Sequence, residues 1–407
     1  MGENHGNLIN GLWRPAGAGS GFVVADAGGA ELERRIRASA DDLDEALGCL
    51  EEGSRSWWAR SLEERGEVLD SLELTSGLEI CAAGVAARLA LSHEQARALL
   101  EEDMGELEVQ ASESVSGPGV ALVRCAPTAL LSGLASLMLP SLERGWTVLL
   151  LADPELPWLA EALANAWLGA GAPRDALALL HDDGGTCARS ALRSERLSGV
   201  LVCDLEERLE GLRSKLLPRE SAGFGAGVLD HSTAAFHGVP LRDATTVVTS
   251  ACDPEAEAVA IAEAAFGSSL ALWGEREASI GRVVCHERQL SAFTASLLEA
   301  CDALERRDGP LIRPLLPNSE AWMEALSQSA VGEGATTLRG GASGSNESSH
   351  RGKLCRSVFT NVEPNWRLAR AGRPAATLSL LRASDDEGAQ KLALACDSDS
   401  DSSPLPG

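Results

Sequence analysis

The sequence is poor in basic residues and has no long apolar run, and each shortage excludes a class of partner. It has 35 Lys and Arg against 60 Asp and Glu, a formal net charge of −25, whereas nucleic acids and anionic lipid surfaces bind clustered cations. Its apolar runs fall short of the ~20 residues that span a bilayer. The N-terminal stretch MGENHGNLING has no apolar signal-peptide core. We therefore predict a cytoplasmic protein that binds neither nucleic acid nor membranes.

The ten cysteines contain no C-x-x-C pair. A zinc ribbon or a disulfide framework is therefore not indicated. His231 and His237 are spaced as metal ligands could be, but no third ligand stands nearby. We predict no bound metal, and reduced cysteines that lie mostly in the core.

The stretch from Thr147 to Leu180 predicts the fold class. Thr147 to Ala152 is a continuous apolar run between Gly145 and Pro154, as in a strand buried on both faces. Leu159, Leu163 and Trp167 then repeat at helical spacing, and Ala176 to Leu180 is apolar again. Such a βαβ unit has parallel strands, because the crossover helix returns the chain in the same direction. The sequence therefore predicts an α/β protein with a parallel sheet.

The rest of the chain predicts two α/β domains. Ser39 to Asp42 has the composition of a helix N-cap, and helices continue to Glu106 ahead of the first buried strand. Ser221 to Arg242 is Gly-rich and weakly periodic, which indicates a loop, and Asp204 to Glu210 indicates a solvated acidic helix face. We predict domains at 1–240 and 241–396, followed by a disordered acidic tail at 397–407.

Landmarks in this order resemble the aldehyde dehydrogenase superfamily. They are Ile9-Asn10-Gly11 with Trp13, P-x-L-x-x-G-x-T-V from Pro140 to Val148, A-G-A-P from Ala170, G-R-V-V-C-H-E from Gly281 and F-T-N-V-E-P-N-W-R-L-A-R from Phe359. The resemblance implies a Rossmann-like parallel-sheet nucleotide domain with an N-terminal helical layer, and a second α/β domain. It also implies that the chain is C-terminally truncated relative to the family.

The same resemblance implies that the family's catalytic residues are missing. Its nucleophilic cysteine stands in G-Q-x-C, where this chain has Gly274-Glu275-Arg276-Glu277. The oxyanion-binding asparagine of P-W-N-F corresponds to Thr128, and no glutamate between His231 and Thr246 can serve as the family's general base. A carboxylate such as Glu277 cannot replace a thiolate as the nucleophile.

The cofactor segments differ as well. The K-P-S-E lysine, which holds the adenine ribose, corresponds to Leu151. The G-S-T-x-x-G turn corresponds to Asp204 through Leu209, so both glycines are absent and acids face the place of the pyrophosphate. The NAD-binding and catalytic domains would both be degenerate, and we predict that the chain takes no cofactor.

Two functions remain. The first is a pseudoenzyme that most resembles the non-catalytic second half of the family-16 aldehyde dehydrogenases. It would bind another protein, either a catalytic aldehyde dehydrogenase homologue or a second copy of itself. The alternative is an NAD- or NADP-dependent oxidoreductase that acts on aldehydes through a rearranged site. Cys285 or Cys252 would then be the nucleophile, although we predict that both are structural.

Overall fold

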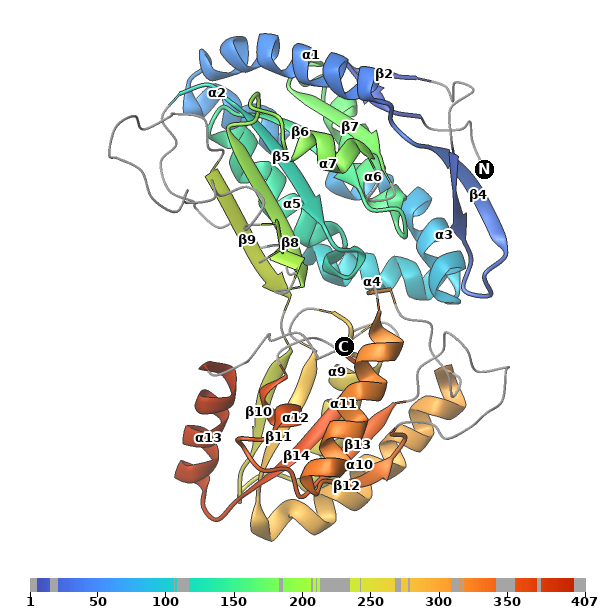
Figure 1. Ribbon diagram of the computed structural model, residues 1–407, viewed down its shortest axis with the longest axis vertical. Coiled ribbons are helices and arrows are strands. Elements are labelled where there is room, and N and C mark those ends of the chain that lie inside the picture. Colours follow the sequence, from blue (N-terminus) through green and yellow to red (C-terminus); the bar gives the residue numbers. More distant parts are fainter. Residues whose placement is uncertain are drawn as a thin grey trace, which may run out of the picture. The chain divides into compact units, whose positions relative to one another are not determined.

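The computed structural model describes residues 6–14, 21–105, 107, 117–182, 186–205, 208–209, 211–212, 235–241, 243–267, 272–276, 279–308, 315–316, 318–341, 356–371 and 375–398. The chain divides into two units. Unit 1 comprises Met1–Asp204 and Arg208–Pro240, and unit 2 comprises Leu205–Glu207 and Leu241–Gly407. Figure 1 colours unit 1 from blue to yellow-green and unit 2 from yellow to red. Each unit is described by itself.

The described part of unit 1 contains a seven-stranded sheet in the order β2-β1-β7-β6-β5-β8-β9. β5 to β8 run parallel, with Leu122 between Leu149 and Val200 in register. Every residue of β6, β7 and β8 is buried, as in a sheet covered on both faces. The strands are β1 (Leu8–Ile9), β2 (Leu12–Trp13), β5 (Val120–Cys125), β6 (Thr147–Ala152), β7 (Leu177–His181), β8 (Gly199–Leu205) and β9 (Ala235–Leu241). A separate hairpin pairs β3 (Gly21–Ala25) with β4 (Glu31–Ile36).

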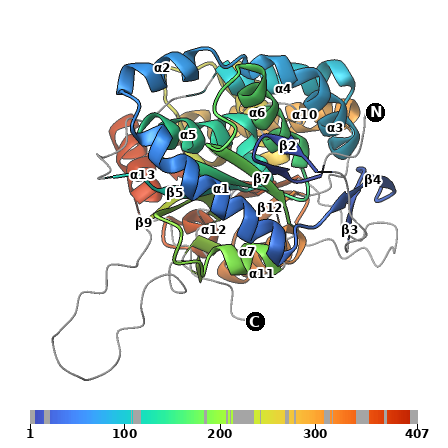
Figure 2. The same ribbon diagram turned by 90° about the horizontal axis from the view of Figure 1, so that it is seen from above.

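Helices cover the sheet of unit 1. α1 crosses β5, β6 and β7, and α5 and α6 pack on the same three strands (Figure 2). The expected N-cap of α1 is confirmed, since the Ser39 hydroxyl accepts the Asp42 amide and the Asp42 carboxylate accepts the Ser39 amide. The helices are α1 (Ala40–Trp58), α2 (Leu62–Asp70), α3 (Leu78–Leu89), α4 (His93–Gly105), α5 (Leu130–Glu143), α6 (Pro157–Gly169) and α7 (Thr186–Ala191), with short 3₁₀ turns η1 (Leu74–Gly77) and η2 (Pro127–Ala129).

The predicted βαβ unit is confirmed as β6, α6 and β7. Leu149 and Leu151 of β6 join Leu43, Leu47 and Leu50 of α1 in one apolar cluster. Burying such side chains stabilises the fold by roughly 2 kcal/mol each. This packing fixes the sheet whose carboxyl ends form the candidate site.

The described sheet of unit 2 has the order β10-β11-β14-β13-β12, parallel except for β12. α9 and α10 bury Phe266, Phe293 and Leu297 against it, and α13 packs along β10, β11 and β14. The elements are β10 (Ala244–Val248), α9 (Pro254–Phe266), η3 (Leu272–Gly274), β11 (Ile280–His286), α10 (Glu287–Asp308), α11 (Ser319–Glu333), β12 (Thr336–Arg339), β13 (Ser357–Thr360), α12 (Arg367–Arg370), β14 (Thr377–Ala383) and α13 (Asp386–Ser398). None of the described helices is both long and apolar enough to cross a membrane.

The structure corrects the prediction of a loop at Ser221 to Arg242, because β9 occupies its end. Gly238 and Pro240 weaken the strand signal in this stretch. A proline is tolerated in an edge strand, where one side of the backbone needs no ladder partner, and β9 lies at the sheet edge beside β8. Tertiary pairing therefore overrides the local sequence here.

Candidate functional site

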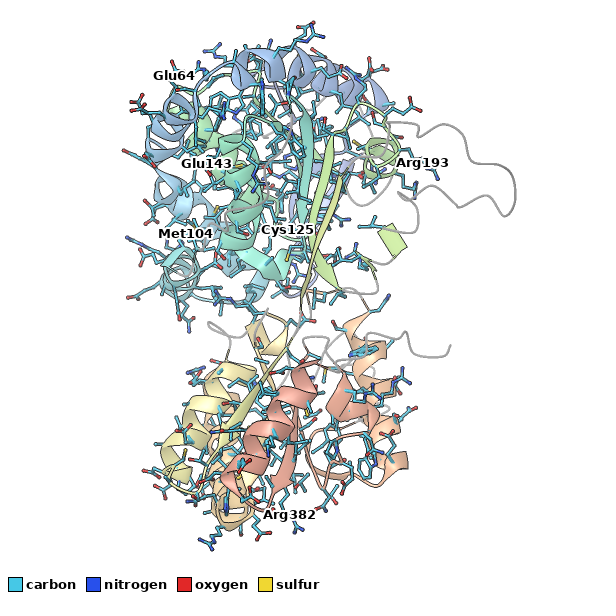
Figure 3. The ribbon with its side chains drawn as sticks, turned by 90° about the vertical axis from the view of Figure 1, so that its left-hand side faces the viewer. Glu64, Met104, Cys125, Glu143, Arg193 and Arg382 are labelled. Carbon is cyan, nitrogen blue, oxygen red and sulfur yellow. The ribbon has the colours of Figure 1, made fainter. Side chains whose placement is uncertain are left out.

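The carboxyl ends of β5 and β8 form the switch point of the unit 1 sheet. β5 leads through α5 to β6 on one side, whereas β8, which follows α7, lies on its other side. The Ala126 amide donates to the Cys203 carbonyl at 2.7 Å, so the segments after the two strands begin side by side, near Cys125 in Figure 3. In open α/β sheets, ligands bind at such switch points. We therefore take this edge as the candidate site.

Thr128, which corresponds to the family's oxyanion donor, lies in η2 directly after β5. Its side chain is fully buried, and its hydroxyl has no hydrogen-bond partner in the described part of the chain. Leu130, two residues later, has a φ of 49°, which side-chain-bearing residues rarely adopt. A buried polar atom without a partner and a strained backbone are both enriched at functional turns. The fold thus brings Thr128 to the switch point.

Asp103 of α4 occupies the N-terminus of α5, although no sequence motif signals it. Its carboxylate accepts the amides of Leu131 and Ser132 at 3.0 and 2.8 Å and the Ser132 hydroxyl at 2.6 Å. The free amides of a helix N-terminus are a general site for phosphates. Here a carboxylate of the chain itself, 1% exposed, binds them. Only tertiary structure could reveal this pairing, because 28 residues separate Asp103 from Leu131.

At the end of β6, the position that corresponds to the family's lysine is a core residue. Leu151 is 2% exposed and packs in the apolar cluster under α1. The next polar side chain, Asp153, lies 3.8 Å from Arg124 of β5 and accepts the Glu155 amide at 2.9 Å. Burial raises the pKa of Asp153 to about 6, although Arg124 acts in the opposite direction. Leu151 therefore offers no donor to a ligand, and Asp153 is the ionisable side chain at this strand end.

Arg88 of α3 supplies a second charge pair near the same strand end. Its guanidinium donates through both Nε and Nη2 to the Glu155 carboxylate. The Arg88 side chain is 2% exposed and that of Glu155 is 42% exposed. A two-point bond of this kind holds a guanidinium firmly in place. Arg88 is therefore already paired within the chain.

The prediction of a solvated acidic face at Asp204 to Glu210 is wrong at Asp204, whereas Glu206, Glu207 and Glu210 lie outside the described residues. Asp204 is 1% exposed and belongs to β8, and its carboxylate accepts a hydrogen bond from Arg208 at 3.2 Å. Leu209 packs in the apolar cluster of unit 1. The strand continues to Leu205, two residues beyond its last pair with β5 at Cys203, on the side of the sheet where β9 is its other neighbour. Two positions that correspond to the family's glycines thus point into the interior.

These residues fit a ribose better than a phosphate. Carboxylates at the ends of β6 and β8 repel a pyrophosphate at short range. The guanidiniums of Arg88, Arg124 and Arg208 each face a carboxylate of the chain. A carboxylate that follows the second strand of such a fold can accept hydrogen bonds from ribose hydroxyls, and Asp153 has this place. The charges at this edge therefore suit a sugar hydroxyl better than a phosphate.

None of the described cysteines whose pKa is shifted has the lowered pKa of an activated thiol. Burial raises the pKa to about 12 in Cys81 and Cys187 and to about 11 in Cys285 and Cys301. Cys285 is fully buried in β11. Cys252 is half-buried just before α9, with its sulfur 3.1 Å from the Thr249 hydroxyl. These environments are those of structural cysteines.

Glu275, which stands two positions before Glu277, is anchored by hydrogen bonds that no sequence motif signals. Glu277 itself lies outside the described residues, as does His231. Glu275, two positions earlier, is 1% exposed and accepts hydrogen bonds from the amides of Leu315 and Leu316 and from the Ser319 hydroxyl. Among the described residues, no group of three His, Cys, Asp or Glu side chains is placed to hold a metal ion.

No protein-family model matches the sequence, and no curated protein sequence is significantly similar to it. Solved structures are similar in fold. Aldehyde dehydrogenase C of Pseudomonas syringae, a mutant with NAD+ and octanal, matches with a TM-score of 0.76 over 96% of this chain and 82% of its own, at 16% identity. Betaine aldehyde dehydrogenase of Staphylococcus aureus, with NAD+, matches with a TM-score of 0.76 over 97% and 83%, at 13% identity. NADP-dependent glyceraldehyde-3-phosphate dehydrogenase of Bacillus halodurans, with NADP, matches with a TM-score of 0.70 over 96% and 83%, at 19% identity.

These likenesses confirm one prediction and contradict another. The expectation that the chain takes no cofactor is contradicted, because proteins with this fold are solved with NAD+ or NADP bound. The missing motif residues were an insufficient reason for it, since the switch point that carries a nucleotide in such folds is still formed here. The expected α/β fold with a Rossmann-like parallel sheet and a second α/β unit is confirmed. The chain has the fold of the aldehyde dehydrogenases.

Proposed function

We propose that this chain is an aldehyde-dehydrogenase-fold protein that does not oxidise aldehydes and acts by binding another protein. The partner would be a catalytic homologue or a second copy of the chain. The observation that carries the proposal is the state of the thiols. Cys285, the candidate for a displaced nucleophile, is fully buried with a pKa raised to about 11, and Glu277 stands where the resemblance expects the nucleophile.

The remaining residues support the same proposal. A carboxylate at Glu277 would be a much weaker nucleophile towards a carbonyl than a thiolate. Thr128 corresponds to an oxyanion donor but carries a hydroxyl that is fully buried, and losing one such donor costs roughly 3 kcal/mol in the barrier. Because barrier contributions add, the losses in rate multiply.

We further propose that the switch point binds a nucleotide of the NAD or NADP class with reduced affinity. Structures with this fold hold these nucleotides. In this chain Asp153 would accept hydrogen bonds from a ribose, while Asp153 and Asp204 would oppose the phosphates. The cytoplasmic location expected from the sequence stays a prediction.

The test of activity is NADH production by the purified chain and by the Glu277→Cys variant, with short and long aldehydes. We expect no turnover from either protein, because restoring the sulfur does not restore the oxyanion donor or the phosphate site. Turnover on the order of 1 per second by the unmodified chain would refute the proposal. The same turnover by the variant alone would show that Glu277 is the single defect.

The test of nucleotide binding is thermal unfolding with increasing NAD+. At a concentration a few times the dissociation constant, a ligand adds about 1 kcal/mol of stability, and we expect this only at millimolar NAD+. Asp204→Asn should bind more tightly, because it removes a charge that opposes the phosphates and leaves the ribose acceptor Asp153 in place. Equal affinity in both proteins would place the nucleotide elsewhere.

A further inference from the structure

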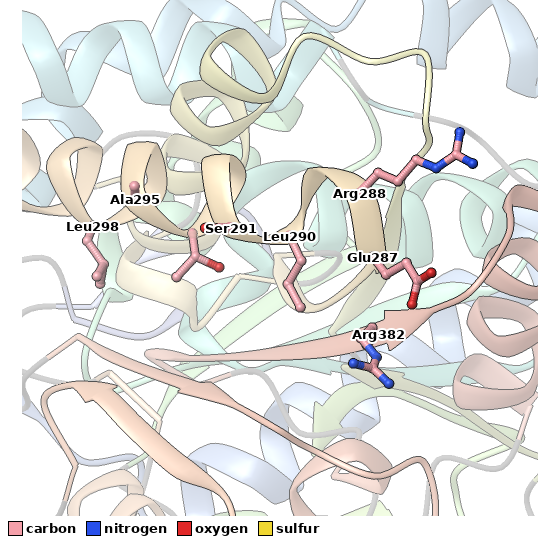
Figure 4. A pocket seen from close by; sticks show the side chains of 8 residues that line it. Glu287, Arg288, Leu290, Ser291, Ala295, Leu298 and Arg382 are labelled. Atoms are coloured by element: carbon pink, nitrogen blue, oxygen red, sulfur yellow. The ribbon is translucent and has the colours of Figure 1, made fainter.

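A groove of about 680 Å³ lies on unit 2 along the first three turns of α10, beside the end of β14. Figure 4 shows Leu290, Ala295 and Leu298 following one another along the helix, with Glu287, Arg288 and Arg382 at the other end. This groove has no part in the candidate site of unit 1. Its volume is that of a ligand site, but such sites usually enclose most of their ligand.

The charged end of the groove carries two cations that form no ion pair in the described part of the chain. Neither Arg288 nor Arg382 forms an ion pair with any described residue, and both side chains are exposed. Glu287 lies at the same end, so the residues that line the groove carry one net positive charge. Beyond the lining, hydrogen bonds from Ser250 lower the pKa of Asp386, and Arg288 attracts that carboxylate as well. On a chain with a net charge of −25, two unpaired guanidiniums at the end of a groove are a place for an acidic group.

The rest of the groove is an apolar stripe. Leu290, Thr294 and Leu298 stand on successive turns of α10 and are half-buried, so they present methyl groups over about 12 Å of helix. Helices that dock in grooves place their anchors at this spacing, three or four residues apart. The length and period of the stripe therefore match a second helix lying against α10.

We propose that this groove docks an amphipathic helix of a protein partner, with acidic residues at the end that meets Arg288 and Arg382. The inference rests on the proposed binding function and specifies the surface and the partner segment. A small ligand fits less well, because Ser291, Ala295 and both arginines are exposed and the groove covers only one side of a ligand. A helix of a protein partner fits better, because the partner protein covers its other faces and only one face has to bind the groove.

The experiment uses the full chain and a designed, fluorescently labelled alanine-based helix. The probe carries two glutamates in its first turn and leucines at three positions spaced three and four residues apart. A second probe has lysines in place of the glutamates. Fluorescence anisotropy measures both affinities, and we expect the glutamate probe to bind ~tenfold more tightly, since each exposed ion pair contributes up to about 1 kcal/mol.

Variants locate the binding. Arg288→Glu with Arg382→Glu should weaken the glutamate probe ~tenfold, and Glu287→Gln should tighten it ~twofold by removing a repulsive charge. Leu298→Ser should weaken both probes equally, because it removes apolar contact without changing charge. The matched control is Arg306→Glu, which changes one charge on the exposed far end of α10 and should leave affinity within ~twofold.

Two results would overturn the inference. The first is that the glutamate probe does not bind at millimolar concentrations of the chain. The second is that Arg306→Glu weakens the affinity of the probe as much, per charge changed, as the groove variants do. The second would mean attraction to overall charge rather than to this groove. NADH production is recorded for the same variants. Aldehyde oxidation together with intact probe binding would refute the proposed function alone. Absence of NADH production together with absence of probe binding would refute the groove alone.

Discussion

The switch point of unit 1 and the groove of unit 2 use charge in opposite ways. At the switch point, Asp103 binds the N-terminus of α5, Glu155 binds Arg88 and Asp204 binds Arg208. In the groove, Arg288 and Arg382 are exposed and have no ionic partner among the described residues. Buried charges must be satisfied within the chain because their desolvation is costly, whereas exposed charges remain available. The comparison indicates that the charges of the groove are more available to a partner than those of the switch point, which are paired within the chain.

The largest effect should come from breaking a charge at the switch point. Asp103→Ala leaves two amides and a hydroxyl at the start of α5 without their acceptor. Because Asp103 is 1% exposed, water cannot fully replace it, and we expect a loss of about 3 kcal/mol in the free energy of unfolding. Urea denaturation measures it. The control is Asp70→Ala at the exposed end of α2, which should change stability by less than ~0.5 kcal/mol. Similar losses in both variants would show that the α5 cap is unimportant.

An intermediate effect should appear in the pH dependence of stability. The pKa of Asp153 is raised to about 6 in the folded chain from an ordinary 3.8. Between these values the unfolded chain loses the proton first, so the native state binds more protons and this group costs stability as the pH rises from 4 to 6. The Asp153→Asn variant has no titrating group at this position, so its stability does not fall with pH for this reason. Its stability relative to the unmodified chain should therefore rise by about 2 kcal/mol between pH 4 and pH 7. Urea denaturation across this range is the measurement, and a constant difference would contradict the raised pKa.

The smallest effect on stability should come from the groove. Arg288→Glu with Arg382→Glu removes no ion pair of the chain, so the free energy of unfolding should change by less than ~0.5 kcal/mol. The same double variant should nevertheless bind the glutamate probe ~tenfold more weakly than the unmodified chain does. A decrease of several kcal/mol in the free energy of unfolding of this variant would show that the arginines stabilise the fold. The contrast between the two regions would then no longer hold.

Particular residues show what could be read before the structure. The capping pair Ser39 and Asp42 and the βαβ unit from Thr147 to His181 follow from short-range rules, because their signals lie within one helical turn or one apolar run. Thr128 was placed by resemblance and does lie at the switch point. Asp204 was misjudged, since its acidic neighbours suggested a solvated helix although the residue belongs to a buried strand.

The sequence by itself determined the α/β class and the acidic character of the chain, because apolar periodicity and net charge are properties of composition and local order. Tertiary structure alone decided which charges are used. Asp103 reaches α5 across 28 residues, Glu155 reaches Arg88 across 67, and Arg382 meets the start of α10 only because β14 pairs with β11. Such pairings depend on which strands and helices become neighbours. That choice results from burying the whole core at once, and no single stretch of sequence records it.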